Sequence, residues 1–129
     1  MAGLIGSLPS TTHAVATGGD PLAAATAAGS LLLPRERRTV PLVLASVPVH
    51  MGISIAWGVV LTALLPTRAR VLSGALSGLV IAAVDLGVIG RRRPRIRALP
   101  LLPQLADHIV FGATVGGLLD RRRVRGERE

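Results

Sequence analysis

The sequence predicts an all-α fold, namely a multi-pass transmembrane bundle of three to four spanning helices plus a short interfacial helix. Half of the 129 residues are apolar, and long apolar stretches alternate with clusters of arginine. With one Trp, one Phe and no Tyr, a water-soluble core would consist almost wholly of Ala, Val, Leu and Ile. Contacts between membrane helices, in contrast, favour small residues. The composition therefore favours a membrane bundle.

Two segments are long and apolar enough to cross a bilayer, which takes about 20 residues. Residues 42–65 form an apolar run bounded by proline on both sides. Residues 71–90 form a second run between Arg70 and Arg91, in which Asp85 is the only charged residue. We expect both segments to be spanning helices.

A third helix is expected at 104–119, at the short end for a span, with Pro103 well placed at its start and an interfacial turn at 100–103. Residues 2–17 form a short or kinked helix around Pro9, and whether this segment spans stays open.

Asp20 and Pro21 favour the start of another helix over 21–33, about 20 Å long at about 1.5 Å per residue. That length is too short to span, so we place this helix at the interface or in a re-entrant segment. Residues 1–120 thus make a single membrane domain, and 121–129 a basic tail.

The net charge of +8 comes from fifteen basic residues, all of them arginine. They form clusters at 35–38, 68–70, 91–97 and 121–128, as membrane flanks do. Without aromatic side chains on which bases could stack, we expect no nucleic-acid binding. The partner we expect is the lipid bilayer with its anionic lipids. Candidate contacts to lipid headgroups are Arg91, Arg92, Arg93, Arg121, Arg122 and Arg123.

The absence of Lys beside abundant Ala and Arg points to a GC-rich bacterial genome, and hence to the bacterial inner membrane. The beginning of the chain has no basic segment, so we expect no cleaved signal peptide there.

With four crossings, one side of the membrane receives eight Arg and the other seven, so the charge distribution assigns no orientation. A dual-topology protein would show the same near balance. Homo-oligomerisation also stays open.

Ionisable residues inside the apolar segments are costly in lipid, and by default they indicate a functional site. His50 lies about 12 Å into the first span, Asp85 about 8 Å from the far end of the second, and Asp107 and His108 about 5 to 6 Å into the third. Because successive spans run in opposite directions, all of them fall in one half of the bilayer. His13 joins them if residues 2–17 cross.

Small residues recur at helical spacing beside these polar groups, on the faces expected to meet. The predicted packing positions are Gly74 and Gly78 in the second span, Gly112 and Gly116 in the third, and Ser54 and Gly58 in the first. Three interpretations of the polar cluster stay open. It holds helices together by hydrogen bonds, it forms a proton-responsive or ion-conducting site, or it lines a pocket for a lipid or small molecule.

We find no nucleophile with a nearby base, no phosphate-binding loop and no paired carboxylates of a soluble cleft. The chain has no Cys, and its His and Asp residues lack a fixed metal-ligand spacing. We therefore expect a non-enzymatic protein without cofactor or catalytic residues. Its polar cluster favours, as an alternative, a subunit of a proton- or cation-coupled transporter or channel. A second alternative is a membrane scaffold that binds anionic lipids.

The order of features over residues 49–123 resembles the YagU-like family of small bacterial inner-membrane proteins, although aromatic residues are nearly missing here. The resemblance implies a multi-pass inner-membrane protein and brings no established biochemical activity. It lies in Val49-His50, Leu65-Pro66, the run Gly74-Ala75-Leu76-Ser77-Gly78-Leu79, Leu99-Pro100, Asp107-His108-Ile109-Val110 and the Arg run from Arg121.

Overall fold

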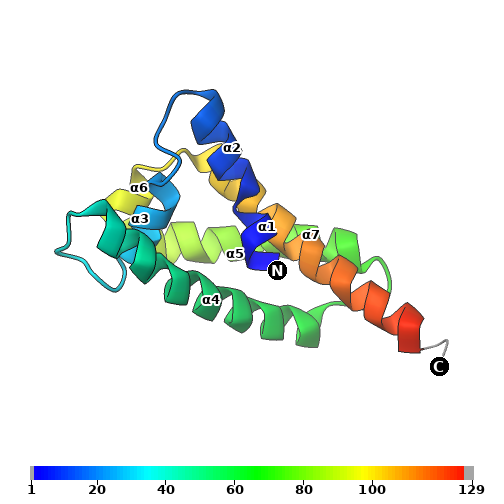
Figure 1. Ribbon diagram of the computed structural model, residues 1–129. Coiled ribbons are helices and arrows are strands. Elements are labelled where there is room, and N and C mark those ends of the chain that lie inside the picture. Colours follow the sequence, from blue (N-terminus) through cyan, green and yellow to red (C-terminus); the bar gives the residue numbers. More distant parts are fainter. Residues whose placement is uncertain (1, 127–129) are drawn as a thin grey trace.

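The computed structural model describes residues 2–126, and within that range the chain is helical with no strand, which confirms the predicted all-α class. Three long helices, α4, α5 and α7, form the body of the molecule, and α3 and α6 lie together at one end of it (Figure 1). In chain order the elements are α1 Ala2–Gly6, α2 Leu8–Ala16, α3 Ala23–Gly29, α4 Thr39–Leu64, α5 Arg70–Val84, the π-helix η1 Asp85–Ile89, the 3₁₀-helix η2 Gly90–Arg92, α6 Pro94–Arg97 and α7 Leu101–Gly126.

Helix α4 has 26 residues and is long and apolar enough to cross a membrane. It starts before Pro41, because a proline in the first turn lacks only an N–H that would have no helical partner there. It ends at Leu64, because Leu65 precedes Pro66 and is extended, with φ −68° and ψ 132°. Pro48 lies inside the helix, which continues past it.

The second predicted span differs from a regular helix at its end. Helix α5 stops at Val84, and the backbone passes into the π-helix that begins at Asp85 and then into one 3₁₀ turn. The continuous apolar helix Arg70–Arg92 has 23 residues and also qualifies as a membrane span. The helix expected over 71–90 is therefore present, and its backbone changes from α to π geometry at Asp85. Single π-turns of this kind often mark functional sites.

Helix α7 has 26 residues and is longer at both ends than the predicted 104–119. The expected turn at 100–103 is wrong from Leu101, because Pro103 is tolerated in the first turn of the helix. The basic tail is not separate either, since arginine is a good helix former and the helix runs on to Gly126. Residues 127–129 of that predicted tail lie outside the described residues. By length and composition α7 is not among the candidate spans, unlike α4 and Arg70–Arg92.

The first 30 residues form three short helices. The expected helix over 2–17 is broken by a turn at Ser7 into α1 and α2, so neither half spans by itself. Helix α1 lies against α7 and near the middle of α4, where Gly3 faces Ser54. Helix α3 is shorter than the predicted 21–33. The Asp20 carboxylate accepts the Leu22 N–H at 2.8 Å, which forms a turn before the helix begins.

Helices α5 and α7 approach so closely that backbone meets backbone. A Cβ added at Gly74 would meet the Gly112 carbonyl, one at Gly78 the His108 carbonyl, and one at Gly116 the Arg70 carbonyl. Small residues permit this approach at membrane helix interfaces. The structure thus places all four glycines predicted for this pair at its contact, Gly112 included.

The predicted small-residue face of α4 is different. Ser54 faces Gly3 of the short helix α1 rather than a long helix. Gly58 lines a groove between α4 and α7, and nothing lies within 4 Å of the place that its Cβ would take. Assigning Gly58 to close helix packing was wrong, because at that level α4 meets its neighbours through the Trp57 and Leu61 side chains and not through its backbone. The close approach of α4 is instead to α3, where a Cβ on Gly29 would meet the Leu42 backbone.

The interior is small, and most large apolar side chains point outward. Leu61, Ile81 and Val115 form the buried hydrophobic cluster. Along α4, Val40 is 69% exposed and Leu64 is 75% exposed, and only 6% of its most apolar stretch is buried. A water-soluble domain rarely leaves so continuous an apolar surface uncovered.

The start of α5 offers a test of local strain. Ala69 precedes the helix with φ 53° and ψ 38°, a left-handed conformation that costs a residue with a Cβ about 1 to 2 kcal/mol. We expect Ala69→Gly to raise the free energy of unfolding by about 1 kcal/mol in a detergent titration. Ala83→Gly, an exposed position inside α5, is the matched control and should lower that energy by about 1 kcal/mol. A loss of stability in Ala69→Gly would contradict the expectation.

Candidate functional site

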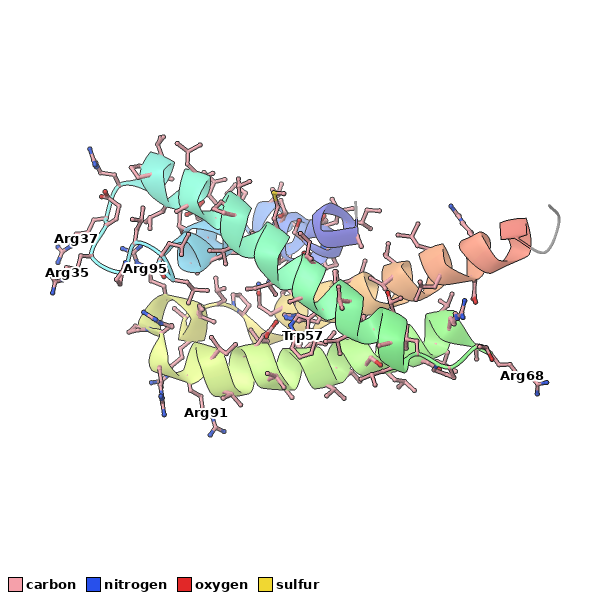
Figure 2. All side chains as sticks on the ribbon, turned by 90° about the horizontal axis from the view of Figure 1, so that it is seen from below. Arg35, Arg37, Trp57, Arg68, Arg91 and Arg95 are labelled. Carbon is pink, nitrogen blue, oxygen red and sulfur yellow. The ribbon has the colours of Figure 1, made fainter. Side chains whose placement is uncertain are left out.

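A cavity of about 170 Å³ lies between the long helices, and the four ionisable residues His50, Asp85, Asp107 and His108 all line it. They come from α4, the start of the π-helix and the first turns of α7. Trp57 lies among the helices at the middle of the molecule (Figure 2). It lines the same cavity.

Asp85 receives hydrogen bonds from Trp57, a residue that the sequence analysis did not single out. The indole Nε1–H donates to both carboxylate oxygens, at 3.3 Å to Oδ1 and 3.2 Å to Oδ2. On the other side, the His108 Nε2 lies 3.5 Å from Asp85 Oδ2. The Asp85 and His108 side chains are 17% and 18% exposed. One carboxylate thus connects α4 with α7.

The partners of His108 determine where its hydrogens lie. Its Nδ1 is 2.7 Å from the Gln104 carbonyl oxygen. A carbonyl only accepts hydrogen bonds, so Nδ1 carries a hydrogen and donates it. In a neutral ring, Nε2 would then direct a lone pair at the Asp85 carboxylate. The contact is favourable only if one proton lies between the two side chains, on Nε2 or on the carboxyl group. The geometry of the Asp85–His108 pair therefore favours the state with one proton between them.

Asp107 caps a helix rather than forming an ion pair. Its Oδ1 accepts the backbone N–H of Ser10 at 2.9 Å, in the first turn of α2. Free N–H groups at a helix N-terminus favour a negative charge. Within the described part of the chain, no basic side chain comes within ion-pair distance of Asp107. His50, on α4, is near enough to interact with it electrostatically.

His13 does not belong to this site. It is exposed on α2 and is not among the residues that line the cavity. Its predicted place depended on residues 2–17 crossing the bilayer as one helix. Because α1 starts near the middle of α4 and the chain breaks at Ser7, His13 lies beyond the level of Asp107. The expectation that it joins the cluster was wrong.

The arginines lie at the two ends of the molecule. Arg35, Arg37, Arg91 and Arg95 gather at one end and Arg68 lies at the other (Figure 2). Of the candidate headgroup contacts, Arg91, Arg92 and Arg121 are exposed and Arg93 is half-buried, while the side chains of Arg122 and Arg123 lie outside the described ones.

The loop between α3 and α4 is held by charged groups. The Arg95 Nη2 donates to the Glu36 carbonyl oxygen at 2.8 Å, which ties α6 to this loop. The Glu36 carboxylate accepts from the Arg38 side chain at 3.1 Å and from the backbone N–H groups of Arg37 and Arg38. These hydrogen bonds, first of all the side-chain bond from Arg38, lower the pKa of Glu36 to about 2.

This loop gives a direct pH prediction. Because the pKa of Glu36 is depressed, the loop contact is complete above the ordinary glutamate pKa of about 4.3 and is lost as the pH falls toward 2. We expect the Glu36 carboxyl carbon to titrate by NMR with a midpoint of about 2. Arg38→Ala should move the midpoint up toward about 4.3, whereas Arg35→Ala should not. An unchanged midpoint in Arg38→Ala would contradict this assignment.

Among the described residues, no three His, Asp or Glu side chains are arranged to hold a metal ion. The site is thus a partly open set of two carboxylates and two imidazoles beside an indole, which can bind and release protons and can attract a cation. No family model, curated protein or solved structure matches the chain.

Proposed function

We propose that the chain is a non-enzymatic, multi-pass protein of the bacterial inner membrane, built around a proton-holding cavity. The observation that carries this proposal is the outward direction of the apolar side chains of α4, of whose most apolar stretch only 6% is buried. Uncovered in water, such a surface would be costly, whereas lipid covers it without cost.

Helix α7 is the third proposed crossing. It packs along the glycine contact with α5, from Arg70 and Gly116 at one end to Gly78 and His108 near the other. A helix packed along a spanning helix lies at the same depth in the bilayer. At about 1.5 Å per residue its 26 residues are also long enough, at about 39 Å. The features that resemble the YagU-like family lie on α4, α5 and α7 or directly beside their ends, and they support the same assignment.

The topology can be tested directly, since the chain contains no Cys and single-cysteine variants have no background. We expect the protein to stay in membranes after carbonate extraction. With a membrane-impermeant maleimide, Arg37→Cys and Arg92→Cys should label to the same extent in any vesicle preparation. Arg68→Cys and Arg121→Cys should form the second matched pair. Release of the protein by carbonate would contradict three crossings. So would labelling of Arg92→Cys to the same extent as Arg121→Cys and to a different extent from Arg37→Cys.

A second candidate, a subunit of a proton- or cation-coupled transporter or channel, is favoured by the proton between Asp85 and His108. Buried groups that exchange protons are the usual components of a proton relay. This candidate predicts pH-driven flux in proteoliposomes that Asp85→Asn abolishes and His13→Gln leaves intact. Absence of flux with a broad panel of ions would contradict the transporter or channel candidate.

A further inference from the structure

The walls and size of the cavity define the ligand that fits it. A cavity of about 150 Å³ in a protein interior accepts a benzene ring, and this one measures about 170 Å³. Apolar side chains from several helices line it, among them Leu31, Ile53, Leu86 and Phe111. The space therefore suits an apolar group of the size of one ring.

The charges in the cavity define the polar end of that ligand. The Asp85 carboxylate already has partners in the protein, because it receives the Trp57 N–H and faces Nε2 of His108. Asp107 interacts with Ser10 and, through space, with His50 and His108, and no arginine of the described residues pairs with it. A ligand cation at Asp107 would pair with this carboxylate, whereas an anion there would meet a group of like charge.

Two rings lie where they would assist such a cation. Phe111 is one helical turn after Asp107 on the same face of α7, and Trp57 faces the cavity from α4. Aromatic faces attract cations and pack against ligand rings. Phe111, on the face of α7 that carries Asp107, would add to the interaction with the carboxylate, and Trp57 would pack against the ligand from the wall beside Asp85.

We propose that this cavity binds a small primary ammonium ion that carries a ring-sized apolar group, with the ammonium group at Asp107. This inference deepens the proposed function, because it names a ligand class for the same cavity. It does not depend on transport.

The probe is benzylammonium at pH 7, with neutral benzyl alcohol and anionic benzoate as ligands of matched size. Trp57 is the only Trp, so its fluorescence reports on the cavity alone. In the purified full-length protein we expect a saturable change with benzylammonium and an affinity about tenfold or more above that of benzyl alcohol. Benzoate should bind least. Equal affinities for the amine and the alcohol would overturn the proposal, and this comparison needs no variant.

Asp107→Asn should reduce the affinity for benzylammonium to that for benzyl alcohol, and the alcohol itself should bind as before. Asp20→Asn, an exposed carboxylate outside the cavity, is the matched control and should change neither affinity. Full preference for the amine in Asp107→Asn would overturn the proposal. Because binding is measured on purified protein, this outcome is distinct from release of the chain by carbonate, which would contradict the membrane assignment alone.

Discussion

Gly78→Ala will destabilise the protein by about 2 kcal/mol or more, although alanine is normally the better helix former by about 1 kcal/mol. A Cβ at Gly78 would lie 2.7 Å from the His108 carbonyl carbon and 2.8 Å from the Ile109 Cα. Both are backbone atoms of α7, so neither can move aside as a side chain would. The two helices must separate, and the contact between Asp85 and His108 lengthens with them.

The matched control is Gly52→Ala in α4, where nothing lies within 4 Å of the added Cβ. This substitution should be neutral or stabilise the protein by up to about 1 kcal/mol. The free energy of unfolding is measured by circular dichroism in mixed detergent micelles. Equal stabilities of the Gly78→Ala and Gly52→Ala variants would show that α5 and α7 are not in backbone contact.

The second large effect concerns pH. The folded protein keeps one proton between Asp85 and His108, whereas a histidine of the unfolded chain loses its proton near pH 6.5. The contribution of this proton to the free energy of unfolding is therefore present in full below about pH 6.5. It falls as the pH rises, by up to about 1.4 kcal/mol per pH unit. We expect a lower free energy of unfolding at pH 8 than at pH 5, measured by the same unfolding titration.

Asp85→Asn should remove most of this pH dependence. An asparagine amide can donate to Nε2 of the neutral His108 ring, so the folded state no longer needs the extra proton. His50 and Asp107 face the same cavity and also titrate, and they stay unchanged in this comparison. His13→Gln, at an exposed position, is the control and should keep the wild-type profile. Identical stabilities at pH 5 and pH 8 in the wild-type protein would contradict a shared proton.

The features that were predictable from sequence follow from local rules. Proline excludes helix after Leu64, and the spacing of Gly74 and Gly78 opposite Gly112 indicates which helix faces meet. The depths of His50 and Asp85 follow from counting residues along antiparallel helices. Each of these inferences needs only residues that are close in sequence, together with the thickness of a bilayer.

The remaining features depend on contacts between distant segments. A π-turn at Asp85 has no sequence signature, and the bond from Ser10 to Asp107 arises only once α1 and α2 lie against α7. The Trp57 partner was the one missed signal that sequence could have supplied. An indole N–H in an apolar segment must find an acceptor, and Asp85 is the only carboxylate in the next apolar run.

The central claim is that one proton lies between Asp85 and His108 inside a membrane bundle, and the direct measurement is ¹⁵N NMR of the histidine side chains in lipid bilayers. The chain has only three His, and His13, which is exposed and outside the cavity, serves as an internal reference. At pH 8 the account predicts a His108 ring whose Nδ1 still carries hydrogen and whose Nε2 shares a proton with Asp85, a signal that changes in Asp85→Asn. A His108 ring with no proton on Nε2 at pH 8, whose signal is indifferent to Asp85→Asn, would contradict it.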